Sequence, residues 1–320
     1  MTRRRAAFGA AMAALVLTMG GCGSTDGEGG DGGGGAGGAA GGSLPTGPLE
    51  RDEAAENGPL ERDEAAENGP LEVRTEELSA EDVDGFGGGT LYYPARGGSY
   101  AVVAAAPGLG ADESMVAWYG EVLASHGFVT LTMNTDTVND SPDQRGAQIL
   151  DALDHIVEDS VAADRVDGRR LGVLGHSMGG GGALAAAHER TAIRAAVALT
   201  PYYEGEIDDW SRVGAAGLVI GGEGDEIAPV SDHAEPLHDG LDGARERAYL
   251  VLRGDHFVTN TPSRIVTEQV VGWMQRFLSQ PPAGGGEGDH RGALCPAPEH
   301  DDEEVVESRD SCPHSGAGDD

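Results

Sequence analysis

The fold of this chain is decided by the stretch Leu171-Gly172-Val173-Leu174-Gly175-His176-Ser177-Met178-Gly179-Gly180-Gly181-Gly182. Its first four residues predict a short buried strand, and the small residues from Ala183 to Ala187 predict a tightly packed helix after it. The glycines on either side of Ser177 allow a sharp turn that a Cβ would obstruct. Strand, turn and helix together predict a serine hydroxyl raised above a sheet, beside a helix N-terminus whose dipole favours a negative charge.

Apolar strand patterns alternate with helical patterns on both sides of this stretch. We expect strands at residues 100–106, 128–133, 171–174, 195–199, 218–220 and 248–252, and helices at residues 113–125, 142–158 and 262–278. The alternation predicts an α/β fold with a mainly parallel central sheet and helices on both faces. Reactive groups in such a sheet lie at the carboxyl ends of its strands.

Residues 1–22 have the pattern of an export signal. Arginines at positions 3 to 5 precede an apolar run that ends near Met19 and is too short for a stable membrane span. This start also fits a twin-arginine signal. Because Met19-Gly20-Gly21-Cys22 resembles a lipobox, we expect a secreted protein anchored to the outer face of the cell membrane by a lipid on Cys22. The alternative is an ordinary signal with an incidental cysteine.

A long polar segment follows the signal. Residues 23–46 are mostly glycine and predict a flexible linker. Residues 47–68 hold two identical copies of an acidic 11-residue unit, in which Gly-Pro favours a spacer over a coiled coil. We therefore expect the folded domain at residues 69–313, followed by an acidic tail at residues 314–320.

The charge of the chain is extreme. Its formal net charge is −34, and all 21 basic residues are arginine. A small domain usually carries a net charge of magnitude ~2–8, and self-repulsion at a higher density opposes folding unless salt screens it. We therefore expect adaptation to high salt, with a merely acidic secreted protein as the alternative. An acidic surface also argues against nucleic acid as a partner, and we expect a monomer.

Two cysteines lie near the C-terminus. In an exported protein, the short spacing of Cys295 and Cys312 favours a disulfide that holds the tail. A metal site is the alternative, because His290, His300 and His314 lie nearby. Their spacing matches no zinc pattern, so we expect no metal.

A nucleophilic serine needs a base, and the base needs a third group that orients it. In a fold of this kind, the chain order is serine, acid, histidine. Asp225 follows the strand at residues 218–220, and His256 follows the strand at residues 248–252. Ser177, Asp225 and His256 are therefore the predicted catalytic triad. The weaker candidates are the acids Glu223 and Glu226 and the histidines His126, His155, His233 and His238.

A serine that attacks a carbonyl group also needs two backbone N–H donors for the developing oxyanion. One candidate is Met178, directly after the serine, and the other is Leu109, in the loop that begins with Pro107-Gly108. The segments between Ser177, Asp225 and His256 are too short for an inserted cap domain. We therefore expect an open site without a lid, and no cofactor.

Several motifs together resemble the bacterial cutinase and polyester hydrolase family of α/β-hydrolases, which includes the PET hydrolases. The resemblance covers residues 69–313 and includes the C-terminal cysteine pair. It rests on Gly88-Gly89-Thr90-Leu91-Tyr92-Tyr93-Pro94, Ala106-Pro107-Gly108, Leu123-Ala124-Ser125-His126-Gly127-Phe128-Val129, the stretch from Gly175 to Gly182, Asp225-Glu226-Ile227-Ala228-Pro229-Val230 and Gly272-Trp273-Met274-Gln275-Arg276-Phe277.

The resemblance implies the same triad and oxyanion donors as the strand order, and it adds substrate-binding roles for Leu109, His176, Met178 and Tyr202. The family usually has Tyr or Phe where Leu109 stands and Trp where Tyr202 stands, and these aromatic rings clamp an aromatic ester unit. His176 is the residue typical of cutinases, whereas some PET hydrolases have Trp. We therefore expect activity on aliphatic polyesters more than on aromatic ones.

The predicted function is that of a serine ester hydrolase of the cutinase type that acts on polyesters. One alternative is a general carboxylesterase or lipase for soluble short-chain esters. Another is a surface-binding lipoprotein without catalysis, which the complete set of Ser177, Asp225 and His256 disfavours.

Overall fold

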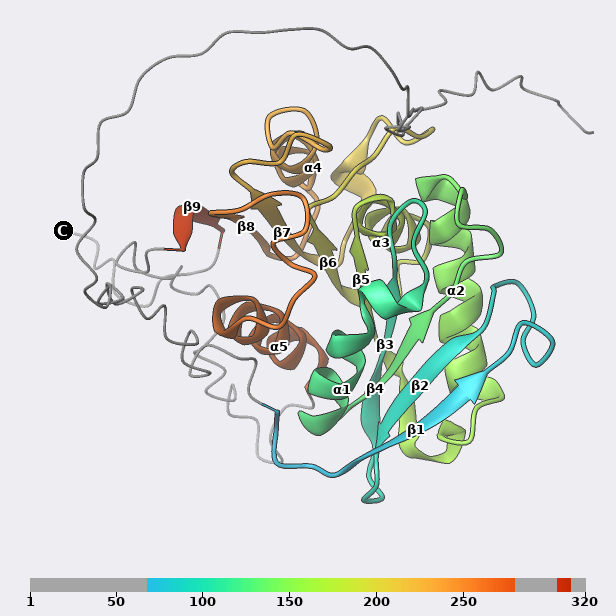
Figure 1. The fold of residues 1–320 in the computed structure, drawn as a ribbon. Coiled ribbons are helices and arrows are strands. Elements are labelled where there is room, and N and C mark those ends of the chain that lie inside the picture. Colours follow the sequence, from blue (N-terminus) through green and yellow to red (C-terminus); the bar gives the residue numbers. More distant parts are fainter. Residues whose placement is uncertain (1–67, 280–303, 312–320) are drawn as a thin grey trace, which may run out of the picture. The chain divides into compact units, whose positions relative to one another are not determined.

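The computed structural model describes residues 68–279 and 304–311 of the chain. The expected export signal with Cys22, the linker, nearly all of the acidic repeats and the Cys295–Cys312 pair lie outside these residues. Within them, nine strands form one sheet in the order β1-β2-β4-β3-β5-β6-β7-β8-β9 (Figure 1). The order β4-β3-β5-β6-β7-β8 is parallel throughout, and β1, β2 and β9 add antiparallel edges.

The bounds of the elements agree closely with the alternation in the sequence. The strands are β1 (Val73–Leu78), β2 (Gly89–Pro94), β3 (Tyr100–Ala106), β4 (Phe128–Met133), β5 (Val166–His176), β6 (Ile193–Leu199), β7 (Ala216–Gly222), β8 (Arg247–Leu252) and β9 (Val305–Asp310). The helices are α1 (Ala117–Ser125), α2 (Pro142–Glu158), α3 (Met178–Glu189), α4 (Ala234–Gly240) and α5 (Arg264–Leu278). No helix in the described ranges combines the length and the apolar character needed to cross a membrane.

The core has two layers, one on each face of the sheet. Along β3, Val102 and Ala104 belong to one layer and Ala101 and Val103 to the other, because successive side chains of a strand point to opposite faces. The first layer packs against α2, α3 and α4, and the second against α1 and α5 (Figure 1). Both faces of the sheet are therefore covered, as the sequence predicts.

The first turn of α2 is held by a capping box. The Ser141 side chain accepts a hydrogen bond from the backbone N–H of Gln144, and the Gln144 side chain accepts one from the backbone N–H of Ser141 at 2.9 Å. Pro142 is the first residue of the helix, where a missing N–H costs nothing. These three residues fix the direction in which the side chains of the first turns point.

Some elements differ from the sequence-based expectation. The expected helix at residues 113–125 is a 3₁₀ turn at Glu113–Met115 followed by α1, and the strand expected at 171–174 extends to Val166–His176. The sequence pattern predicted neither α4 nor the antiparallel strands β1, β2 and β9. Charged residues occupy β1 and β9, which is typical of edge strands and weakens the apolar signal.

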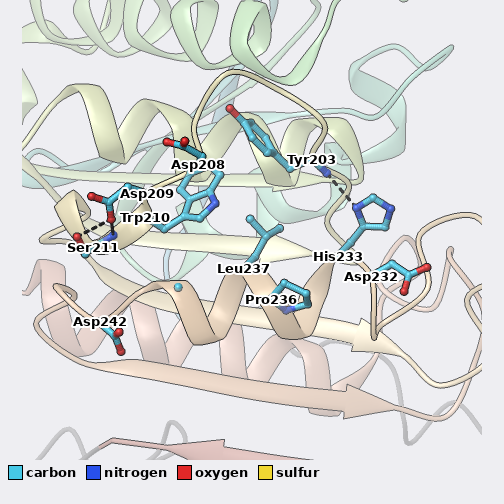
Figure 2. Close-up of a pocket in the computed structure, with 11 residues that line it drawn as sticks. Tyr203, Asp208, Asp209, Trp210, Ser211, Asp232, His233, Pro236, Leu237 and Asp242 are labelled. Carbon is cyan, nitrogen blue, oxygen red and sulfur yellow. Dashed lines mark hydrogen bonds between the residues drawn. The ribbon is translucent and has the colours of Figure 1, made fainter.

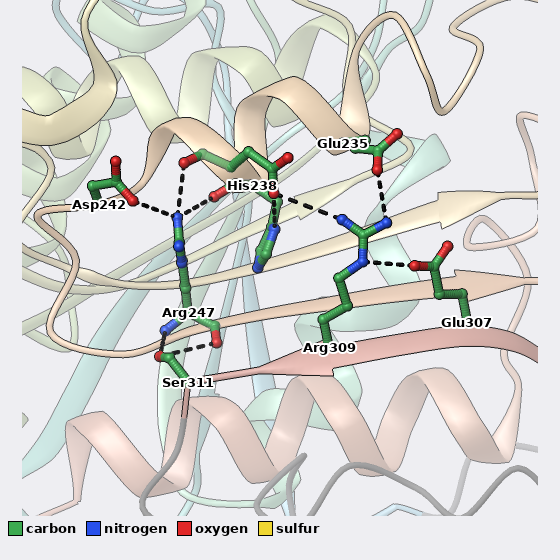
Figure 3. A network of polar contacts seen from close by, with 8 residues as sticks. Glu235, His238, Asp242, Arg247, Glu307, Arg309 and Ser311 are labelled. Carbon is green, nitrogen blue, oxygen red and sulfur yellow. Dashed lines mark hydrogen bonds and ion pairs between the residues drawn. The ribbon is translucent and has the colours of Figure 1, made fainter.

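Ion pairs join β9 to helix α4 (Figure 3). The Arg309 guanidinium donates to Glu235 at 2.7 Å and to Glu307 at 2.6 Å, and it lies over the Tyr249 ring at 4.9 Å. Ser311 closes the end of the strand, because its Oγ accepts from the Arg247 backbone N–H at 2.9 Å. Each of these ion pairs is partly exposed and contributes little alone, so β9 depends on the network and on its pairing with β8.

Candidate active site

Ser177 lies at the sharp turn between β5 and α3. Its φ of 56° is in the left-handed region, which costs a residue with a Cβ about 1–3 kcal/mol. A Cβ on Gly175 would come within 2.1 Å of the Gly179 carbonyl oxygen, and one on Gly179 within 2.3 Å of the Ala106 carbonyl oxygen. The glycines of the motif are therefore required by the close approach of three backbone segments.

The strained turn is held by backbone hydrogen bonds to β6 and the loop after it. The Ser177 N–H donates to the Leu199 carbonyl at 2.9 Å. The Ser177 carbonyl accepts from the N–H groups of Gly181 at 3.1 Å and Tyr202 at 2.9 Å. This bonding orients the serine side chain independently of any substrate.

The structure brings the three residues of the predicted triad together. Ser177 Oγ lies 2.9 Å from His256 Nε2, and His256 Nδ1 lies 2.7 Å from Asp225 Oδ2. Asp225 follows β7 and His256 follows β8, so both side chains come from the carboxyl ends of parallel strands. All three side chains are buried, whereas the rival acids Glu223 and Glu226 are exposed.

The second oxygen of the Asp225 carboxylate is also occupied. Asp225 Oδ1 accepts hydrogen bonds from the backbone N–H groups of Ile227 at 2.9 Å and Ala228 at 2.7 Å. These two donors fix the carboxylate plane and leave Oδ2 for His256. An acid held in this way orients the imidazole and stabilises its charged form.

The backbone of His256 is held by two side chains that contact its carbonyl oxygen. Thr200 Oγ1 donates to it at 2.9 Å, and His176 Nε2 lies 2.9 Å from it. Burial lowers the pKa of His176 to about 4, so the ring is neutral and Nε2–H is the donor. The sequence grouped His176 with substrate-binding residues, but its side chain is only 2% exposed and contacts the His256 backbone. Sequence reasoning missed Thr200, whose only signal was its place at the end of β6.

The predicted oxyanion donors come from two segments that meet at Ser177. Met178 is the first residue of α3, where backbone N–H groups have no partner within the helix. Leu109 lies in the loop after β3, and a Cβ on the preceding Gly108 would come within 2.9 Å of the Ser177 Cβ. The loop therefore touches the serine, which brings the Leu109 backbone close to the nucleophile.

Exposed apolar side chains surround the triad. Leu109, Ile227 and Phe257 are 55%, 57% and 45% exposed. Leu109 is a predicted oxyanion donor, Ile227 lies two residues after Asp225, and Phe257 directly follows His256. Val138, also exposed, lies against the loop after β3 that carries Leu109, because the Val138 carbonyl accepts a hydrogen bond from the Gly110 N–H at 2.8 Å. We call these four residues the apolar rim. In the part of the chain that the structure describes, the other large exposed apolar side chain is Val161, between α2 and β5.

The predicted substrate-binding residue Tyr202 is partly buried and packs on a histidine. Its ring lies 4.4 Å from the His233 ring, measured between centroids, at an interplanar angle of 32°. His233 also lines a cavity of about 410 Å³ that contains no triad residue (Figure 2). The other residues that line this cavity are Tyr203, Asp208, Asp209, Trp210, Ser211, Asp232, Pro236, Leu237, Gly240 and Asp242. Among the described residues, no group of three or more His, Cys, Asp or Glu side chains is arranged to hold a metal ion.

Comparison with known proteins agrees with this architecture. The PET hydrolase-like family matches residues 49–313. The chain is 42% identical to a bis(hydroxyethyl) terephthalate hydrolase of Streptomyces coelicolor over 246 residues, which is 76% of each chain. It is also 42% identical to cutinase 2 of Thermobifida cellulosilytica over 75% of this chain and 90% of that protein, and 42% identical to cutinase cut1 of Thermobifida fusca over 75% and 74%. The chain therefore belongs to the PET hydrolase-like family of α/β-hydrolases and is a carboxylic ester hydrolase.

Proposed function

We propose that this protein hydrolyses polyesters through an acyl-enzyme on Ser177. His256 Nε2 takes the Ser177 hydroxyl proton while Oγ attacks the ester carbonyl carbon. The backbone N–H groups of Leu109 and Met178 stabilise the negative oxygen of the tetrahedral intermediate. The intermediate collapses as His256 returns the proton to the leaving alcohol, and a water molecule then releases the acid by the same steps. The hydrogen-bonded row Ser177–His256–Asp225 supports this mechanism.

The apolar rim is the observation that carries the choice of a polymer as substrate. Four of the five large exposed apolar side chains in the described residues border one site, although the chain as a whole carries a net charge of −34. An exposed apolar patch with a polar surround is typical of a surface that meets another apolar surface. A solid polyester offers such a surface, whereas a small soluble ester does not need one.

The proposal favours aliphatic over aromatic polyesters. Leu109 offers no ring to stack on an aromatic unit, and the ring of Tyr202 is already packed on His233. An aromatic ester therefore gains less from stacking at this site than at one with two free aromatic rings. Relatives named for terephthalate ester and cutin hydrolysis indicate that both substrate classes are worth measuring.

The proposed setting of the enzyme rests on the sequence outside the described residues. The protein is secreted and is held at the outer face of the membrane by a lipid on Cys22. Residues 23–68 tether the enzyme at a distance from that membrane, and a Cys295–Cys312 disulfide holds the C-terminal segment. The net charge of −34 supports a monomer that works in high salt.

The test is product release by the full chain from aliphatic and aromatic polyester films in molar salt, beside hydrolysis of a soluble nitrophenyl ester. Ser177→Ala is expected to abolish both activities. Release from films that depends on Ser177 supports the proposal. Cleavage of the soluble ester without any release from films would instead identify a general carboxylesterase.

Rim variants test the role of the apolar surface. Ile227→Ser is expected to lower film hydrolysis several-fold and to leave kcat on the soluble ester nearly unchanged, because the Ile227 side chain is 57% exposed and the contact with Asp225 is made by its backbone N–H. Val161→Ser is the matched control, because Val161 is 53% exposed but lies away from the site. Equal losses in both variants would contradict the rim.

A further inference from the structure

The loop that carries the Leu109 amide has almost no side-chain packing of its own. Gly108 and Gly110 have no side chain, and that of Leu109 is exposed. Gly110 also has a φ of 73°. Gly108 lies close against Ser177, and the Ala111 N–H donates a long hydrogen bond of 3.4 Å to the Gly108 carbonyl. The shorter hydrogen bonds that hold the loop are at its ends and involve the Pro107 carbonyl and the Gly110 N–H.

Both ends of the loop lead to one fully buried side chain, Arg145 of α2. Its Nη1 donates to the Pro107 carbonyl at 3.0 Å. Its Nη2 donates at 2.8 Å to the Val138 carbonyl, which also accepts from the Gly110 N–H at 2.8 Å. Arg145 thus holds the start of the loop directly and its end through a shared acceptor.

The remaining donors of Arg145 fix the guanidinium itself. Nε donates to the Asp140 carbonyl at 3.0 Å, and Nη1 also donates to Thr135 Oγ1 at 3.3 Å. All four acceptors are uncharged oxygens. Desolvation lowers the pKa of Arg145, and the Asp140 charge opposes this effect. A buried cation is costly. The planar guanidinium group of Arg145, with its five N–H donors, lets this one side chain reach three separate carbonyls.

We propose that Arg145 is the positioning residue of the oxyanion hole, because it holds the Pro107 and Val138 carbonyls and so keeps the Leu109 amide directed at the oxygen that becomes negative. This inference rests on the proposed mechanism at Ser177. Arg145 does not touch the substrate. Its effect is on the transition state, which needs the amide in place, more than on binding of the ground state.

The test compares Arg145→Lys and Arg145→Gln with the wild-type full chain on a soluble nitrophenyl ester. Neither side chain can reach three carbonyls, so the loop is expected to shift. We expect kcat per folded molecule to fall about 10–100-fold, with KM changed less than about threefold. The loss is smaller than the roughly 10²–10³-fold loss caused by removing an oxyanion donor, because the Leu109 amide is displaced and not removed. The inhibition constant of a trifluoromethyl ketone, which forms a tetrahedral oxyanion on serine, is expected to rise by a similar factor.

Arg170→Lys is the matched control. Arg170 is also a buried arginine that donates to backbone carbonyls, those of Leu278 and Ser99, but it lies roughly 20 Å along β5 from Ser177. We expect this variant to lower Tm and leave kcat and the inhibition constant per folded molecule unchanged. A purely structural role for Arg145 would give the same result as Arg170→Lys and would overturn the proposal.

Two further measurements keep the outcome decisive. If both Arg145 variants fail to fold, Thr135→Val is used instead, because it removes one hydrogen-bond acceptor of Arg145 Nη1. This variant is expected to weaken inhibition by the trifluoromethyl ketone without raising KM, and unchanged inhibition would refute the proposal. Ser177→Ala is measured in parallel. If wild-type hydrolysis does not depend on Ser177, the proposed function fails, whereas Ser177-dependent hydrolysis with unaffected Arg145 variants refutes only the positioning role.

Discussion

Replacing Asp225 by asparagine should inactivate the enzyme without unfolding it. Asp225 Oδ1 accepts from the N–H groups of Ile227 and Ala228, so the single oxygen of an asparagine side chain is needed at that position. Its NH₂ group then faces His256 Nδ1, which must act as an acceptor. The proton of the imidazole moves to Nε2, and Nε2 can no longer take the proton of Ser177.

The magnitude follows from the alternative orientation of the amide. Turning the NH₂ group toward the two N–H donors restores the productive tautomer but leaves both donors unsatisfied. A buried unsatisfied group costs about 1–3 kcal/mol, so the productive orientation lies about 2–6 kcal/mol higher. At about 1.36 kcal/mol for each factor of ten, we expect kcat to fall between roughly 30-fold and roughly 10⁴-fold.

The assay is kcat on a soluble ester near neutral pH, together with Tm. Asp225→Asn keeps both backbone hydrogen bonds and should lower Tm little. Asp225→Ala, which leaves both backbone N–H groups and His256 Nδ1 without their hydrogen-bond partner, should lower Tm clearly. The reasoning is refuted if Asp225→Asn retains kcat within about fivefold of wild type, because the low value of the expected range is roughly 30-fold.

Three other predictions concern the sharp turn at Ser177, the pH dependence of stability and its salt dependence. Gly179→Ala places a Cβ 2.3 Å from the Ala106 carbonyl oxygen and should lower both Tm and kcat, whereas Gly97→Ala, with open space around it, should change neither. His176 has a pKa of about 4 in the folded protein, below its value of about 6.5 when unfolded, so only the unfolded state binds its proton between these values. The free energy of unfolding should therefore fall as the pH drops from about 6.5 to about 4. In urea unfolding, the wild type should lose up to about 3 kcal/mol more than His176→Gln over this range, and equal losses would contradict this. With a net charge of −34, Tm should rise as NaCl is added, and a Tm independent of salt would argue against charge repulsion.

Much of the fold could be predicted because its signals are local. The strands β3, β4, β6, β7 and β8 and the second half of β5 are largely apolar and buried, since both faces of a parallel sheet are covered. The edge strand β1 carries polar and charged residues, Arg74, Thr75 and Glu77, at its exposed positions, and the seven-residue helix α4 is too short for a periodic pattern. Their positions depend on pairing and packing with distant segments, which local patterns do not report.

The sequence by itself predicted the three side chains that the structure brings together as a hydrogen-bonded row. Each follows a recognisable strand, and the carboxyl ends of parallel strands meet at one edge of the sheet, so their order along the chain was enough to predict that Ser177, Asp225 and His256 lie together. Only the tertiary structure decided which side chains support them. The contact of Arg145 with the Pro107 carbonyl joins residues 38 positions apart, and that of His176 with the His256 carbonyl joins residues 80 apart. Such contacts exist because the packed sheet brings these segments together, and no spacing in the sequence encodes them.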